Sequence, residues 1–313
     1  MSGPVSQAED ACSESAPKVS VCICTLSRPH VAETIKSVLD QEGLDGCAFE
    51  IIVADDDPKL SAQRVVQEMA EKTSIPVRYV PCGARNVAVA RNACLDAARG
   101  DWIAFIDDDE RADPGWLASL LSAQKAYGAD VVKGMVRGIY PAETPIWIKI
   151  ADPFTRDYGP TGQTPKEMAT GNVFFRRALA APPHHRFDPA FGRTGGEDTD
   201  FFRRLTQMGA RIVACREAVV DEVVPVERVS LVYLSGRARR LGQIEQRKQH
   251  LYLAGDYALG KRLALAVVAI SLLWVHPLLR LADARLAYKT FAKFWYCVGM
   301  VEGATLARSD EMS

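Results

Sequence analysis

The stretch Gly100-Asp-Trp-Ile-Ala-Phe-Ile-Asp-Asp-Asp-Glu110 decides the fold of this chain. Its apolar run, Trp102 to Ile106, ends abruptly in three aspartates, Asp107 to Asp109. A short continuous apolar run that stops at acids is typical of a central strand in a parallel sheet, with the carboxylates at its carboxyl edge. In open α/β sheets this edge is where ligands bind. The stretch therefore predicts an α/β fold with an acidic binding site at one edge of the sheet.

The three aspartates need a compensating charge. Adjacent carboxylates repel one another and raise each other's pKa unless a cation or a set of donors compensates. A hard divalent ion, Mg²⁺ or Mn²⁺, held by one or two carboxylates and by a substrate diphosphate, meets this need. A solvated acidic turn is the alternative interpretation of an aspartate run taken alone.

Composition sets broad limits on the function. The 313 residues can form one large α/β domain with additions, or two small domains. Lys plus Arg (38) nearly balance Asp plus Glu (39), so no overall field attracts nucleic acid, and we expect no nucleic-acid partner. The eight cysteines include no Cys-x-x-Cys pair, which favours reduced thiols in a cytosolic protein. Residues 1–17 have no apolar core and are expected to form a disordered tail rather than a secretory signal.

A second acidic strand end lies upstream. The β-branched run Val19–Thr25 predicts a first buried strand, and apolar residues at helical spacing predict a helix over Val31–Gln41. The next apolar run, Phe49–Ala54, ends in three further acids, Asp55 to Asp57. We expect these acids to lie at the same sheet edge as Asp107.

An alanine-rich helix precedes the deciding strand. It is predicted between Gly83 and Gly100, and Arg85 and Arg91 lie on or near its first turns, where a cation can face a phosphate or a base. An arginine snorkelling from a packed helix is the alternative for either residue.

The order of these motifs carries a family resemblance. A strand followed by Asp-Asp, then an Ala-Arg-Asn helix, then Asp-x-Asp at a strand end resembles the family 2 glycosyltransferases. Their nucleotide-sugar-binding domain is a single Rossmann-like α/β domain called the GT-A fold. The resemblance runs from about Val19 to about Gly242 and implies a mainly parallel sheet flanked by helices, with a catalytic domain over residues 18–228.

The resemblance also implies roles for individual acids. Asp55 and Asp56 would hold the uracil and ribose of a UDP-sugar, and Asp107 and Asp108 the ribose. A divalent cation would bind Asp107 and, most directly, Asp109. Together with the residues of the first strand and the alanine-rich helix, the expected nucleotide site is Thr25, Asp55, Asp56, Arg85, Arg91, Asp107 and Asp108.

The catalytic segment is expected further along. Gly195 and Gly196 allow a tight turn that places Glu197 and Asp198 at a helix N-terminus, where negative charge is favoured. Helix capping would explain one acid at this position but not two adjacent ones. In the resembled family the Asp of a Glu-Asp pair at this place is the general base, which implies Asp198 as the base and Glu197 as the residue that orients the acceptor.

Two strand-like runs follow, over residues 210–215 and 218–225. Family members often place a metal-binding His near the second run, and this chain has Asp221-Glu222 there. A carboxylate oxygen suits magnesium or manganese, so Asp221 is a further candidate metal ligand. Before this segment, residues 141–165 show no periodicity and predict a long loop, either a lid or acceptor surface or a plain connection.

The C-terminal part is predicted to be helical. Residues 229–258 form a basic segment whose arginines could neutralise a diphosphate, face anionic lipid or face solvent. In the apolar region 259–313, the run 263–279 falls slightly short of the roughly 20 residues that span a bilayer. Aromatics with Lys289 and Lys293 then resemble an interfacial helix. We expect membrane contact through residues 259–307, with a buried hairpin or a dimer contact as the alternative.

Together with the family resemblance, these features predict a metal-assisted, inverting glycosyltransferase. It would move one sugar from a nucleoside diphosphate sugar, with a UDP-sugar as the expected donor, to a glycan or lipid-linked acceptor at the inner face of the cell membrane. No Gln-x-x-Arg-Trp motif of processive synthases is present, which favours single-sugar transfer. A nucleotidyltransferase is one alternative, but residues 25–29 lack the glycines of its phosphate loop. A non-catalytic nucleotide-sugar-binding protein is the other, and the Glu197-Asp198 pair weighs against it. The hypothesis requires the acids at 55–56, 107–109 and 198 to share one cleft.

Overall fold

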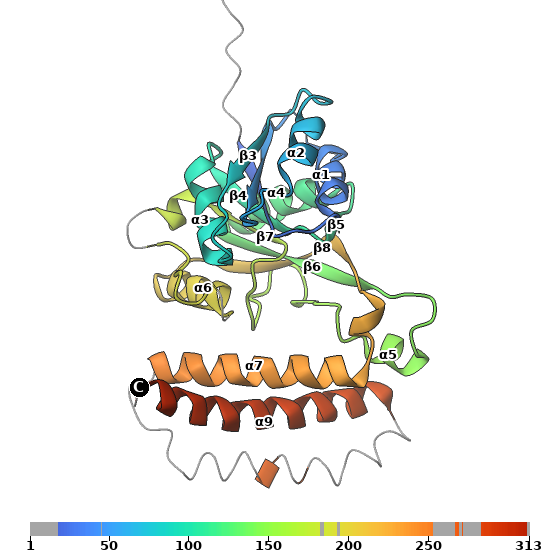
Figure 1. Ribbon diagram of the computed structural model, residues 1–313. Coiled ribbons are helices and arrows are strands. Elements are labelled where there is room, and N and C mark those ends of the chain that lie inside the picture. Colours follow the sequence, from blue (N-terminus) through green and yellow to red (C-terminus); the bar gives the residue numbers. More distant parts are fainter. Residues whose placement is uncertain are drawn as a thin grey trace, which may run out of the picture.

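The described part of the chain forms an eight-stranded sheet in the order β3-β2-β1-β4-β7-β6-β8-β5, with helices on both faces and a pair of long helices beneath it (Figure 1). This computed structural model describes residues 18–44, 46–181, 185–192, 195–252, 267–268, 271 and 283–311. The expected α/β architecture is confirmed, and the expected tail over residues 1–17 lies outside the described residues.

The first half of the sheet is parallel, as predicted. Its strands are β1 (Val19–Thr25), β2 (Phe49–Asp55), β3 (Val77–Pro81) and β4 (Trp102–Asp107). In the register, Thr25 lies opposite Asp55, and Cys24 lies opposite Asp107. The strands therefore end level with one another, and the acids that follow them meet at one edge.

The second half of the sheet is mixed, with β5 (Glu110–Ala112), β6 (Val131–Ile139), β7 (Val173–Arg176) and β8 (Ile212–Val223). β7 runs antiparallel to β4 and β6, β8 runs parallel to β6, and β5 runs antiparallel to β8. The two strands predicted over 210–225 are one strand, because β8 bulges where Gly134 pairs with Cys215 and Met135 with Val219.

Helices cover both faces because the strand side chains alternate. Val19, Val21 and Ile23 pack under α1 (Val31–Leu39), α2 (Gln63–Ala70) and α4 (Trp116–Tyr127). On the opposite face, Cys22 and Phe105 pack under α3 (Val87–Ala97) and α6 (Glu197–Gln207). α1 confirms the helix predicted over Val31–Gln41 and α3 confirms the helix predicted between Gly83 and Gly100, both with shorter bounds.

The C-terminal helices α7 (Leu231–Tyr252) and α9 (Ala284–Glu311) lie side by side and run in the same direction (Figure 1). Glycines let their backbones touch: a side chain at Gly242 would overlap the backbone of Tyr296, and one at Gly299 would overlap the backbone of Arg239. The helical C-terminal prediction is thus confirmed for these two segments. None of the described helices is long and apolar enough to cross a membrane. The apolar run 263–279 lies outside the described residues apart from positions 267, 268 and 271.

Short helices complete the described fold. The 141–165 segment, predicted as a long loop, contains α5 (Ile146–Ala151), which packs against α9. Two 3-10 turns, η1 (Arg177–Ala180) and η2 (Val226–Arg228), follow β7 and β8.

Candidate active site

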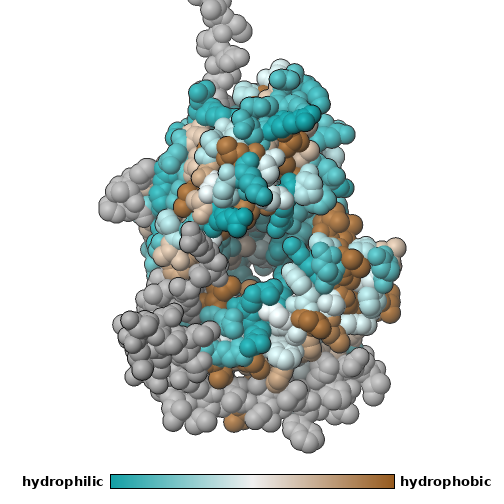
Figure 2. All heavy atoms as spheres, viewed as in Figure 1, coloured by the Kyte–Doolittle hydropathy of each residue, from teal (hydrophilic) through white to brown (hydrophobic). Residues whose placement is uncertain are grey.

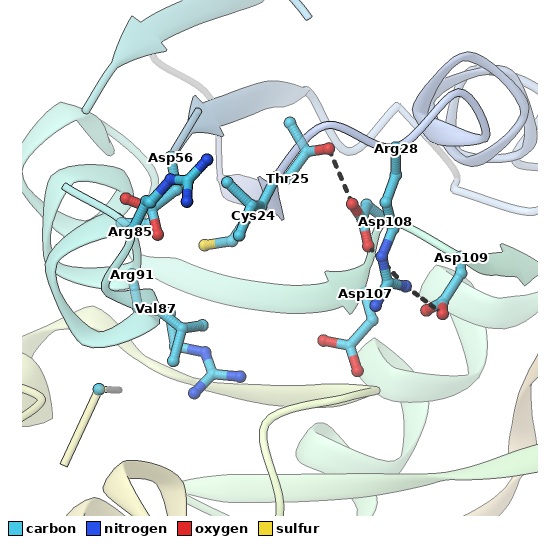
Figure 3. Close-up of a pocket in the computed structure, with 13 residues that line it drawn as sticks. Cys24, Thr25, Arg28, Asp56, Arg85, Val87, Arg91, Asp107, Asp108 and Asp109 are labelled. Carbon is cyan, nitrogen blue, oxygen red and sulfur yellow. Dashed lines mark hydrogen bonds and ion pairs between the residues drawn. The ribbon is translucent and has the colours of Figure 1, made fainter. Parts of the chain in front are cut away.

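A cavity of about 450 Å³ opens at the carboxyl ends of the parallel strands. Figure 3 shows Asp56 and Arg85 on one side of it and Asp107 to Asp109 on the other. The residues that line it are Cys24, Thr25, Leu26, Arg28, Asp56, Arg85, Val87, Ala90, Arg91, Asp107, Asp108, Asp109 and Gly192. Most of the predicted nucleotide site is therefore gathered in one place.

Asp108 and Asp109 are held by groups from the β1–α1 connection. The Thr25 hydroxyl donates to Asp108 Oδ2 at 2.7 Å, and Arg28 Nη1 lies 3.2 Å from Asp108 Oδ1. Arg28 also forms an ion pair with Asp109. Burial raises the pKa of Asp108 to about 6, although Arg28 and the Thr25 hydroxyl act against this. The positive charge of Arg28 therefore compensates the neighbouring aspartates, and this role was not predicted from the sequence.

Asp55 and Asp56 have different environments. The Asp55 carboxylate lies fully buried beneath the cavity, where it accepts hydrogen bonds from Ala62 N at 2.8 Å and from the Tyr79 hydroxyl at 3.0 Å. Asp56 lines the cavity and accepts from Ala84 N at 3.0 Å, and burial raises its pKa. The structure therefore places Asp56 for contact with a ligand and Asp55 as support for the loop.

Arg85 and Arg91 both reach the cavity from the start of α3. Asn86 caps this helix by accepting from Ala88 N at 3.1 Å. Arg85 adopts a left-handed backbone conformation, with φ of 49°, which is uncommon for a residue with a side chain and is found most often at functional sites. Arg91 is buried and forms an ion pair with Glu197. The N-terminal half of α3 is therefore tied to the first residue of α6.

The Glu197-Asp198 pair lies at the N-terminus of α6, as predicted. Gly195 and Gly196 have φ of 84° and 101°, values that suit glycine. Burial raises the pKa of Glu197, and Arg91 opposes this rise. Asp198, the neighbour of Glu197, accepts a hydrogen bond from Thr199 N at 2.6 Å. Asp198 is not among the residues that line the cavity, whereas Arg91, the ion-pair partner of its neighbour Glu197, is one of them.

A buried ionic network lies beside the acidic loop, and the sequence did not predict it. Glu110 is fully buried, accepts from Asp107 N at 3.0 Å and pairs with Arg156 at 3.3 Å. Arg156 also lies 3.0 Å from Glu222. Lys133, which is 1% exposed, donates to the carbonyls of Gly171 and Asn172. Burial raises the pKa of Glu110 and lowers that of Lys133. A lysine within the apolar run Val131-Val-Lys-Gly-Met-Val136 was the signal that could have revealed it.

The acids of β8 divide between its two sides. Asp221 accepts from Arg137 Nε at 2.6 Å in an exposed ion pair. Its neighbour Glu222 points to the other side, where burial raises its pKa and the charges of Asp109 and Asp107 add to this rise. Strand alternation thus turns Asp221, the candidate metal ligand, away from the acidic loop.

The acidic loop offers a small set of ligands for a metal ion. Within the described ranges, no three His, Cys, Asp or Glu side chains are grouped so that they could hold one. Mg²⁺ is commonly bound by one or two carboxylates together with substrate phosphates and water. Asp107 and Asp109 fit that pattern in ligand type and number. A methyl group on Gly171 would lie 2.8 Å from Asp107 Oδ2, so glycine there leaves room beside this carboxylate.

Comparisons with known proteins agree on one family. The family model described as "Glycosyl transferase family 2" matches residues 20–181. The chain is similar to the succinoglycan biosynthesis protein ExoM of Rhizobium meliloti strain 1021, with 36% identity over 233 residues, 73% of this chain and 74% of that protein. It is also similar to the GalNAc(5)-diNAcBac-PP-undecaprenol beta-1,3-glucosyltransferase of Campylobacter jejuni subsp. jejuni serotype O:2, with 34% identity over 119 residues, 35% of each chain.

A solved structure shares the fold. The crystal structure of S. aureus TarS matches with a TM-score of 0.51 and 16% identity, over 91% of this chain and 55% of that chain. TarS 1–349 in complex with UDP matches with a TM-score of 0.50 and 16% identity, over 93% of this chain and 92% of that chain. At this identity the likeness concerns the fold alone, and it confirms the predicted GT-A type of α/β fold.

Proposed function

This chain belongs to glycosyl transferase family 2, and from that membership we propose that it moves one sugar from a UDP-sugar to a hydroxyl group of a glycan or lipid-linked acceptor, with inversion at the anomeric carbon. The chain is a glycosyltransferase, which sets aside the nucleotidyltransferase and the non-catalytic binding protein. The UDP complex of TarS supports the donor class, and the undecaprenol in the name of the Campylobacter relative supports the acceptor class.

The observation that carries this proposal is the meeting of Asp56, Arg85, Arg91 and Asp107 to Asp109 in one cavity. Its volume of about 450 Å³ lies within the range of small-molecule sites. Acids at its two sides can accept from the uracil N–H and the ribose hydroxyls, and the two arginines can donate to the diphosphate. We assign the contact with the uracil ring to Asp56 alone, because protein donors already surround the Asp55 carboxylate.

A divalent cation would be held by Asp109 and Asp107 together with the donor diphosphate. When bound, it would offset the negative charge that develops on the leaving diphosphate. Arg28 is paired with Asp109, so it also neutralises this loop before the donor arrives. Arg85 and Arg91 add positive charge at the opposite wall.

Asp198 is the proposed general base. It accepts the proton of the acceptor hydroxyl while that oxygen forms a bond to the anomeric carbon and the bond from this carbon to the diphosphate oxygen breaks. One in-line displacement gives inversion and releases UDP. Glu197 fixes the position of Asp198 through its buried ion pair with Arg91.

Replacing Asp198 by asparagine tests the assignment. We expect UDP release from a panel of UDP-sugars, with membrane extract as the acceptor source, to fall by about 10²–10⁴-fold, because the base is lost while the size of the side chain is kept. UDP affinity measured by calorimetry should stay unchanged. Asp188→Asn, at an exposed turn of the same segment, is the matched control. Similar release rates for Asp198→Asn and wild type would refute the base assignment.

Metal removal tests the cofactor separately. We expect EDTA to lower UDP release and Mn²⁺ or Mg²⁺ to restore it, since a carboxylate-bound cation stabilises the leaving diphosphate. Undiminished release in EDTA would remove the metal from the proposal and leave Arg28, Arg85 and Arg91 as the groups that neutralise the diphosphate.

We also propose that the enzyme works at the inner face of the cell membrane, with contact through residues 259–307. Within the described part of this range, Lys289 and Lys293 are exposed on α9 beside a group of aromatic side chains. Lysines one helical turn apart beside aromatic rings suit the boundary between lipid headgroups and acyl chains.

A further inference from the structure

Arg28 pairs with the carboxylate that we assign to the metal ion. It lines the cavity, and its side chain is 40% exposed. Figure 3 shows it reaching from the β1–α1 connection to the acidic loop, where Nη1 lies 3.2 Å from Asp108 Oδ1 and also pairs with Asp109. Asp109 is the most direct of the proposed metal ligands, so Arg28 and a divalent cation have one partner in common.

The backbone beside Arg28 is held in place. Ser27 has φ of 55°, a left-handed conformation that costs energy for a residue with a side chain and persists where surrounding contacts maintain it. Its hydroxyl donates to Asp57 Oδ2 at 2.6 Å, and the Thr25 hydroxyl donates to Asp108 Oδ2 at 2.7 Å. The loop therefore presents Arg28 to the acidic loop, while the partly exposed guanidinium can change partner by rotation of its side chain.

Arg28 and a divalent cation on Asp109 would repel each other. Both would lie beside the same carboxylate, well inside the Debye length of about 8 Å at physiological ionic strength, so salt would screen them little. A donor diphosphate changes this balance, because phosphate oxygens accept charge-assisted hydrogen bonds from a guanidinium as carboxylates do. With the donor present, Arg28 gains a second anionic partner and can leave Asp109 to the metal ion.

The other arginines of the cavity do not suit this role. Arg91 is 8% exposed and held by its ion pair with Glu197. Arg85 lies with Asp56 on the side of the cavity opposite the acidic loop (Figure 3). Among the described residues that line the cavity, only Arg28 is a cation paired with the acidic loop.

We propose that Arg28 couples metal binding to donor binding. It opposes a divalent cation at Asp109 in the free enzyme and moves its hydrogen bonds to the diphosphate when the nucleotide sugar binds. This inference rests on the UDP-sugar function proposed above and adds an order of binding to it. The metal ion binds weakly alone, and metal ion and nucleotide strengthen each other's binding by the same factor.

Three probes separate the two contacts of Arg28. Mn²⁺ alone, followed by the electron paramagnetic resonance signal of the free ion, reports the competition for Asp109. UDP with saturating Mn²⁺, followed by calorimetry, reports the contact with the diphosphate, and uridine reports the rest of the site. We expect Arg28→Met to bind Mn²⁺ about threefold or more tightly than the wild type. It should bind UDP about tenfold more weakly and uridine equally well.

Two further variants serve as controls. Arg28→Lys keeps the positive charge and should bind Mn²⁺ as weakly as the wild type. Arg111→Met removes a cation two positions beyond Asp109 that pairs with Glu33 and is 52% exposed, so it should change the Mn²⁺ affinity by less than about twofold. Figure 2 shows a mainly hydrophilic surface around the sheet, and solvated ion pairs are typical of such a surface. Misfolding would weaken both ligands, so it cannot produce a gain for Mn²⁺ and a loss for UDP.

Three results would overturn the proposal. The first is Mn²⁺ binding by Arg28→Met that is no tighter than that of the wild type. The second is an equal gain in Arg111→Met, which would assign the effect to overall charge. The third is an unchanged UDP affinity of Arg28→Met. These results stand apart from the proposed activity: Asp198→Asn should bind Mn²⁺ and UDP like the wild type, and EDTA tests the use of the metal in sugar transfer whether or not Arg28 competes for Asp109.

Discussion

Replacing Arg91 by methionine removes one partner of the buried ion pair that links the nucleotide cavity to the catalytic segment. Arg91 is 8% exposed and Glu197 is 5% exposed. The other carboxylate oxygen of Glu197, Oε2, has no hydrogen-bond partner among the described residues. Methionine keeps much of the length and apolar contact of the arginine stem but leaves the carboxylate buried without its cation.

The expected cost follows from this isolation. Removing one partner of a buried ion pair typically destabilises a protein by about 3–5 kcal/mol, because the remaining charge is uncompensated. We therefore expect Arg91→Met to lower the free energy of unfolding by about that amount at neutral to alkaline pH. The companion variant Glu197→Gln leaves Arg91 without this partner but should lower the free energy of unfolding by less, because the charges of Asp107 and Asp198 still act on the guanidinium.

The loss should depend on pH with a definite sign. Burial already raises the pKa of Glu197, and removing Arg91 raises it further. A carboxyl whose folded pKa exceeds its unfolded value binds more protons in the folded state, so stability falls as pH rises from the unfolded to the folded pKa. The penalty of Arg91→Met should therefore be larger at about pH 8 than at about pH 5.

Urea unfolding followed by tryptophan fluorescence measures these effects at both pH values. The double variant Arg91→Met/Glu197→Gln should recover most of the stability lost in Arg91→Met, with a coupling of at least about 2 kcal/mol. The reasoning is refuted if Arg91→Met costs less than about 1 kcal/mol at about pH 8, or if the two single losses simply add in the double variant.

Two further predictions concern the frame around the site. Asn172→Leu should lower the free energy of unfolding, measured in urea, by about 3 kcal/mol or more. The variant leaves Trp116 Nε1 and two backbone carbonyls without their buried hydrogen-bond partner. A loss under about 1 kcal/mol would contradict this role. Gly299→Ala should lower the free energy of unfolding by about 1–3 kcal/mol, because its methyl group would overlap the Arg239 backbone. Gly236→Ala, where the nearest neighbour is 3.6 Å away, should instead stabilise by up to about 1 kcal/mol. Equal effects of the two glycine changes would show that α7 and α9 do not touch closely.

The buried network holds the acidic loop in place through its own charges. Glu110 holds Asp107 N, and Arg156 ties Glu110 to Glu222 on β8. The long 141–165 segment is thereby fixed to the end of β4. The acidic loop and the 141–165 segment share one set of buried charges, so a change in either segment should affect the other.

The sequence alone determined the parallel half of the sheet and the edge at which the site lies. A short apolar run that ends in acids predicts both a buried strand and the residue at which it ends. Both predictions depend only on residues that are neighbours in the sequence. The same local logic located the α3 arginines and the turn that presents Glu197 and Asp198. The order of these motifs then carried the family resemblance, which supplied their expected roles.

Only the tertiary structure decided which of the predicted side chains share the cavity. Asp55 and Asp56 are neighbours in sequence, yet one is enclosed by protein donors and the other faces the cavity. Asp221 and Glu222 point to opposite sides of β8, and a pattern with a period of two cannot say which side faces the site. The ion pairs Arg28–Asp109 and Arg91–Glu197 join residues 81 and 106 positions apart. Such pairings depend on how the strands and helices pack, which no local pattern encodes.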